Sequence, residues 1–81
     1  MTAVYLKNKS KYPYCEIFVC ITEKNVTIKK YTSIEVEINE NSISDELEWY
    51  ISEWEMKEST KKEFDEFYIK IANEINESIN N

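Results

Sequence analysis

The chain has 81 residues and a formal net charge of −6 at pH 7, and it contains neither glycine nor histidine. The lack of glycine excludes the glycine-dependent phosphate loops and dinucleotide turns, and the lack of histidine removes the commonest general base and metal ligand. Its 42% of hydrophobic residues, with 14% aromatic, predict a chain that folds as one small domain spanning residues 1–81.

The first half of the chain alternates between apolar and other residues with a period of two, which is typical of strands with one face on a core. We expect strands within residues about 3–39. A short, weaker candidate is Val4–Leu6, and three alternating segments follow it: Cys15 to Ile21, Val26 to Ile28, and Ile34 to Ile38.

The last two of these segments predict a hairpin with a defined register. If residues 31–33 form the loop, Lys29 lies opposite Glu35 and Ile28 lies opposite Val36, so that charges meet on the solvent face and aliphatic side chains on the core face. A slip of one residue would move Glu35 to the core side.

From about residue 42 the apolar period changes to 3.6, which predicts two amphipathic helices at about 43–57 and 60–79. Ser42 or Ser44 can cap the first helix, and Thr60 with Glu63 has the spacing of a capping box at the second. The apolar stripe of the first helix is Ile43, Leu47, Tyr50, Ile51 and Trp54, and that of the second is Phe64, Phe67, Tyr68, Ile71, Ile75 and Ile79.

Strands first and helices afterwards predict the α+β class. We expect an antiparallel sheet of three to four strands followed by two amphipathic helices packed on one of its faces. Without glycine, Asn8, Asn25, Asn39 and Asn41 are the residues expected at any left-handed backbone position.

No constellation of residues indicates catalysis, and we expect a protein that is not an enzyme and that holds no cofactor or metal. The carboxylates lie on solvated helix faces, and a nucleophilic cysteine would lack a histidine to activate it. Cys15 and Cys20 are five residues apart in one predicted strand, so they should point to opposite faces and remain unbridged.

Membrane insertion and direct nucleic-acid binding are also disfavoured. The longest apolar run, Ile17–Ile21, is far shorter than the roughly 20 residues that span a bilayer, and the first residues do not resemble a signal peptide. Phosphate binding needs clustered basic residues, whereas residues 42–81 hold four lysines against eleven acidic residues. We expect a cytoplasmic protein.

Trp49 is the residue that departs most from the helical pattern. It lies about 200° around the first helix from Leu47, and Met56 falls close to it one heptad later. One interpretation is that the helix is buried on both sides, between the sheet and the second helix. The other is an exposed Trp49–Met56 patch inside an acidic rim, since tryptophan is enriched in binding hot spots.

The acidic surface of the helices supports the same two interpretations, because it either solubilises the domain or attracts a basic partner. Combining it with Trp49 gives the predicted partner-binding residues: Glu48, Trp49, Glu53, Glu55, Met56, Glu66 and Glu77.

In its short length, its abundance of Lys, Asn, Ile and Glu, and its acidic helices, the chain resembles the small inhibitors that phages and other mobile elements make against nucleic-acid-handling proteins, anti-CRISPR proteins among them. The resemblance is one of general character and implies action in the host cytoplasm. The predicted function is inhibition of a basic, nucleic-acid-binding protein by an acidic helical face. The alternative is a toxin-neutralising or self-associating module without mimicry, such as a homodimer, that uses Trp49 and strand residues like Phe18.

Overall fold

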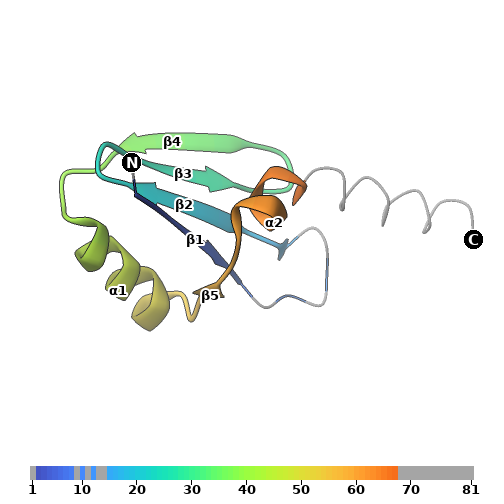
Figure 1. Cartoon of the computed structure of the whole chain (residues 1–81). Helices are drawn as coiled ribbons and strands as arrows, with labels where there is room; N and C mark the ends of the chain where they lie inside the picture. The colour runs from blue at the N-terminus through green and yellow to red at the C-terminus, as the bar shows by residue number, and fades with distance from the viewer. Residues whose placement is uncertain (1, 9, 11, 13–14, 68–81) are drawn as a thin grey trace, which may run out of the picture.

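The computed structural model describes residues 2–8, 10, 12 and 15–67, which form one five-stranded antiparallel sheet and two helices (Figure 1). The spatial order of the strands is β4-β3-β2-β1-β5. The α+β class and the antiparallel sheet are confirmed. The elements in chain order are β1 (Ala3–Lys7), β2 (Phe18–Thr22), β3 (Asn25–Lys29), β4 (Ile34–Ile38), α1 (Ile43–Glu53), β5 (Lys57–Glu58) and α2 (Lys61–Asp65).

The fifth strand accounts for the difference from the three to four strands expected. β5 is only two residues long and pairs with β1 through Leu6–Glu58 and Lys7–Lys57. Two residues are too few for any periodicity, so no sequence pattern identifies such a strand.

The two helices lie against opposite faces of the sheet, and the prediction that both pack on one face is wrong. Successive residues of a strand point to opposite faces. In β2, Val19 and Ile21 belong to the core that contains Tyr50 of α1, whereas Phe18 packs with Phe64 of α2. Because β5 runs along the edge of β1 between the helices, the chain passes around that edge and α2 reaches the other face.

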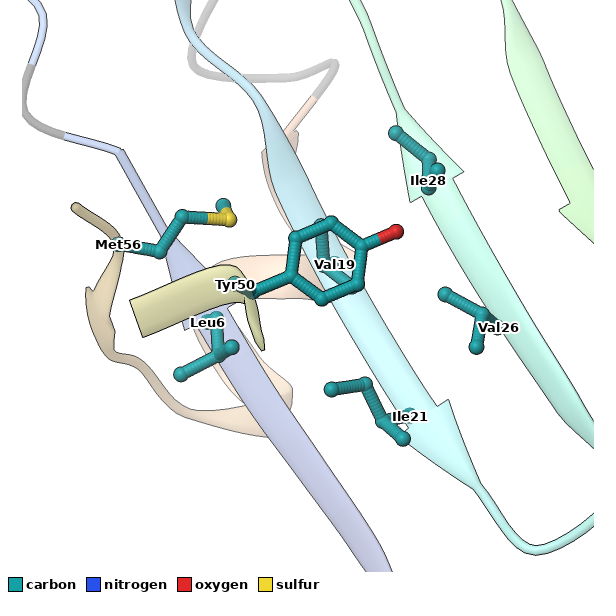
Figure 2. Packing of buried hydrophobic residues seen from close by; sticks show 7 residues of the cluster. All are labelled: Leu6, Val19, Ile21, Val26, Ile28, Tyr50 and Met56. Carbon is teal, nitrogen blue, oxygen red and sulfur yellow. The ribbon is translucent and has the colours of Figure 1, made fainter. Parts of the chain in front are cut away.

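The core on the α1 side is built by three central strands and one helix face (Figure 2). Ile43 and Leu47 of α1 pack against it partly buried. Its buried members are Leu6, Val19, Ile21, Val26, Ile28, Tyr50 and Met56.

The core on the α2 side is aromatic. Phe67 is fully buried, and its ring centroid lies 5.0 Å from that of Phe18. Phe64 packs 5.5 Å from Tyr5, and Lys29 Nζ lies 4.1 Å from the Phe64 centroid while donating a hydrogen bond to the Phe64 carbonyl at 2.8 Å. A cation over an aromatic ring is favourable, so Lys29 ties the sheet to α2.

The predicted start of the second helix is confirmed. Thr60 caps α2, its hydroxyl accepting a hydrogen bond from the Glu63 amide at 3.2 Å. The Glu63 carboxylate pairs with Lys7 at 2.6 Å. The part of the predicted helix beyond residue 67 lies outside the described residues.

The β3–β4 hairpin has a different register from the one expected. Ile28 lies opposite Glu35 and Lys29 opposite Ile34. The reason is the turn, since Lys30 and Ser33 exchange backbone hydrogen bonds of 2.8 and 3.4 Å and leave a two-residue loop. Loop length sets the register of a hairpin, and the shorter loop shifts every side chain of β4 to the other face of the sheet.

Helix α1 ends at Glu53, four residues before the predicted end at 57. Ser42 caps its start as expected, accepting from the Asp45 amide at 3.0 Å. At the other end the Tyr50 carbonyl accepts from both Trp54 and Met56 amides, and Glu55 adopts a φ of 52°. Glu55 is the sole described residue with a positive φ, so the expectation that the asparagines fill such positions is wrong.

Candidate functional site

Three aromatic rings cluster at the C-terminal end of α1. Trp49 lies 4.9 Å from Tyr50 and 5.9 Å from Trp54, centroid to centroid, and Tyr50 lies 5.7 Å from Trp54. Tyr50 is buried, whereas 47% of Trp49 and 40% of Trp54 are exposed, as is 47% of Ile51. We call Trp49 and Trp54, which are both partly exposed and whose rings lie 5.9 Å apart, the aromatic patch. Large apolar side chains exposed together often mark an interaction site.

A groove of about 460 Å³ adjoins Trp49, between α1 and the end of β4. Its floor and walls combine two aromatic rings with three carboxylates. The lining residues are Glu37, Asn41, Asp45, Glu46, Trp49 and Tyr50.

The loop before α1 holds one wall of this groove in place. The Asn39 side chain is buried, donating to the Thr22 carbonyl at 2.9 Å and accepting from the Asn41 amide at 2.8 Å. The Asn41 side chain in turn donates to Glu46 Oε1 at 2.8 Å. The loop thus fixes Asn41 and one carboxylate against the start of α1.

The groove is electrostatically negative. None of its lining residues is basic. Burial raises the pKa of the Tyr50 hydroxyl above its ordinary value, and the carboxylates of Glu46, Glu37 and Glu35 raise it further. A groove with this field favours a cationic group over an anionic one.

The described residues among the predicted partner-binding set do not share one surface. Trp49 is exposed, which rules out burial of α1 on both sides at this residue. Glu48 and Glu53 are exposed on α1, and Glu55 is exposed just after it. Glu66 is exposed but follows α2, on the other face of the sheet, so the acidic residues do not form one continuous helical face.

Met56 is the clear error among these residues. It is 3% exposed and packs in the core with Leu6 and Tyr50 (Figure 2). The heptad spacing from Trp49 assumed a helix through residue 57, whereas the chain turns at Glu55 and directs Met56 inward. Glu77 lies outside the described residues.

The predicted list of binding residues omits most of the site, namely Glu37, Asn41, Asp45, Glu46, Tyr50 and Trp54. Ile51 and Trp54 were assigned to the buried stripe of the helix, although only Tyr50 of α1 is buried. The alternation from Ile34 to Ile38 implied a solvent-facing Glu37, and Asn41 was expected only as a candidate for a left-handed backbone position. The alternation of β4 could not reveal Glu37, because its side depends on the hairpin turn, but the excess of apolar residues on α1 could have indicated an exposed surface.

The described ranges contain neither a metal-ligand cluster nor a helix that could span a bilayer. Their cysteine, aspartate and glutamate residues form no group that could hold a metal ion. In the same ranges, no helix is both long and apolar enough to cross a bilayer.

Comparison with protein-family models, with curated proteins and with solved structures finds no match to this chain. The functional argument therefore rests on the aromatic patch and the adjoining groove.

Proposed function

We propose that this protein binds a basic protein through α1 and inhibits it by covering its nucleic-acid-binding surface. The exposed Trp49, against a groove whose charged residues are all acidic, is the observation that carries the proposal. Binding hot spots are enriched in tryptophan, and they lie at the centre of a patch from which water is excluded.

The aromatic cluster supports a pre-formed binding surface. Tyr50 is buried in the core, and both exposed tryptophan rings contact it. Side chains that are already held in place lose less conformational entropy when a partner binds. The aromatic patch therefore suits protein recognition better than isolated surface tryptophans would.

The carboxylates supply the preference for a basic partner. Glu48 and Glu53 are exposed on α1, and Asp45 and Glu46 line the groove. Regularly spaced negative charges resemble a nucleic-acid backbone to a basic surface, and they accelerate association by long-range attraction. This arrangement agrees with the resemblance to small phage and mobile-element inhibitors, and it makes a defence nuclease or a polymerase the expected type of target.

The test is capture of a partner from a nuclease-treated lysate of a low-GC bacterium, at low and at high salt. We expect a basic protein that wild type retains at low salt, that Trp49→Ala loses, and that Tyr12→Ala retains, since Tyr12 is exposed but lies outside the site. The captured protein should lose its nucleic acid when wild type is added. Retention by Trp49→Ala, or continued nucleic-acid binding in the complex, would contradict the proposal.

A second candidate is an interaction module that acts without mimicry, such as a toxin-neutralising or self-associating protein. The exposed apolar residues of β4 favour it, because they offer a surface that does not depend on charge. Phe18, assigned to this function from the sequence, is 3% exposed and is not accessible. Apolar binding would persist at high salt, whereas charge-steered binding weakens.

A further inference from the structure

Strand β4 forms an edge of the sheet, and all five of its side chains are exposed. In the described part of the chain, no strand pairs with its outer side. An unpaired edge strand offers a row of backbone donors and acceptors to another extended segment, and natural proteins generally block such edges. β4 carries neither a proline nor a lysine that would do so.

The register shows which backbone groups are available. Lys30 and Ser33 form a hydrogen-bonded pair at one end of the hairpin, and the Asn39 amide donates to Lys24 at the other. Bonded and non-bonded pairs alternate in an antiparallel ladder. The backbone N–H and C=O groups of Glu35 and Glu37 therefore form hydrogen bonds with β3. Those of Ile34, Val36 and Ile38 point away from β3, toward the open edge of the sheet.

The same alternation gives β4 one apolar side and one acidic side. Ile34, Val36 and Ile38 point to the face of α2, with 53%, 62% and 80% of each exposed. Glu35 and Glu37 point to the face of α1, where Glu35 forms an exposed ion pair with Lys30 at 3.2 Å and Glu37 lines the groove beside Trp49. A segment paired with β4 would place its own side chains directly beside these.

We propose that β4 binds an extended segment of a partner protein in which aliphatic residues alternate with lysine or arginine. The aliphatic residues lie beside Ile34, Val36 and Ile38, and the basic residues lie beside Glu35 and Glu37. The backbone hydrogen bonds supply affinity and the alternating side chains supply specificity, as in other cases of strand addition. This surface shares Glu37 with the groove beside Trp49 but does not include the aromatic patch, and the proposal does not rest on the function of that patch.

Charge complementarity selects this occupant over a second copy of the chain. In a symmetric antiparallel pair of β4 strands, the residues opposite each other lie on the same face, so the glutamates of one copy would face the glutamates of the other. Like charges directly opposite are destabilising. The chain's own residues 68–81 contain one lysine and two glutamates, and they match the required alternation less well.

The test uses a synthetic peptide of alternating valine and lysine with the ¹⁵N-labelled full chain, and measures amide exchange by NMR. At a peptide concentration about ten times its Kd, exchange at the outward amides of Ile34, Val36 and Ile38 should slow about tenfold. The inward amides of Glu35 and Glu37, already bonded to β3, are the internal control and should change little. The Trp49→Ala variant should give the same result, which separates this surface from the aromatic patch.

Charge reversal provides the matched control. The double variant Glu35→Lys with Glu37→Lys should no longer bind the valine–lysine peptide and should bind a valine–glutamate peptide instead, and a cooperative melting transition should show that the variant folds although it loses the Lys30–Glu35 ion pair. A peptide with the same residues in two blocks should not bind. The proposal is overturned if the outward amides are unaffected by the peptide. It is also overturned if they are already protected in the free protein, which would mean that residues 68–81 or, where protection rises with concentration, a second copy fills the edge.

Discussion

The Trp49 ring lies edge-on against the Tyr50 ring, with an angle of 88° between their planes and 4.9 Å between their centroids. Trp49 is half exposed, whereas Tyr50 is buried against the strands of the sheet. Edge-to-face aromatic pairs are favourable beyond the area they bury. Tyr50 thus connects the exposed aromatic patch to the core, and changes at the two residues should have different effects.

Replacing Trp49 tests the aromatic patch as a binding surface. Trp49→Ala should weaken the partner complex by about 2 kcal/mol or more, the scale of a hot spot, because the ring is half exposed and available for contact. The dissociation constant and the melting temperature should be measured on the same variant, and the melting temperature should fall little.

Fluorescence gives an independent check on Trp49. In a Trp54→Phe background, its emission in the free protein should be accessible to a soluble quencher and become protected in the complex. A signal that is blue-shifted and inaccessible before binding would contradict an exposed ring.

Replacing Met56 should affect stability. Met56→Ala removes a buried side chain from contact with the core, and a buried methionine replaced by alanine costs about 2–5 kcal/mol. Chemical denaturation should show this loss, and any weakening of the partner complex should disappear once the folded fraction is taken into account. A stable variant that fails to bind would instead restore Met56 to the binding surface.

The raised pKa of Tyr50 predicts that the folded protein loses stability at alkaline pH. Its pKa in the folded protein is raised above the ordinary value of 10.0, first by burial and then by Glu46, Glu37 and Glu35. The unfolded chain therefore loses this proton first, and the free energy of unfolding falls as pH rises through about 10. Tyr50→Phe should make this decline shallower, measured as melting temperature against pH.

Glu55 is held in a left-handed backbone conformation that costs a residue with a side chain about 1–2 kcal/mol. Glu55→Gly should raise the free energy of unfolding by about 0.5–1 kcal/mol, after the greater freedom of glycine in the unfolded chain is subtracted. The control is Glu53→Gly, in the last turn of α1, which should be destabilising. If both variants lose stability, the backbone strain at Glu55 is smaller than the conformational entropy that glycine adds to the unfolded chain.

The strand segments of β1 to β4 and the starts of both helices could be predicted from the sequence because each depends on local patterns. Alternation identified β4, and hydroxyl residues at the right spacing identified Ser42 and Thr60 as caps. These signals depend on a few neighbouring residues, and no distant contact is needed to interpret them.

The side of the sheet on which each residue lies could not be predicted in the same way. The two faces of β4 differ by a single residue of register, which the turn at Tyr31 and Thr32 determines. Helix α1 ends at Glu53, two residues before the positive φ of Glu55, and a chain without glycine gives no warning of that position. Both errors affect the candidate site. The hairpin register determines the face of the sheet on which Glu37 lies, and the end of α1 determines that Met56 points into the core.

Strand β2 contributes to two separate cores, with Val19 and Ile21 on one side and Phe18 on the other. Each helix is therefore held against the sheet by a separate core. Undocking α2 would expose Phe18 without separating Tyr50 from Val19. Proteins open in cooperative units of unequal free energy. We expect hydrogen exchange in α2 to occur through partial opening, while the amides shared by β2 and its two neighbours exchange only when the whole domain unfolds.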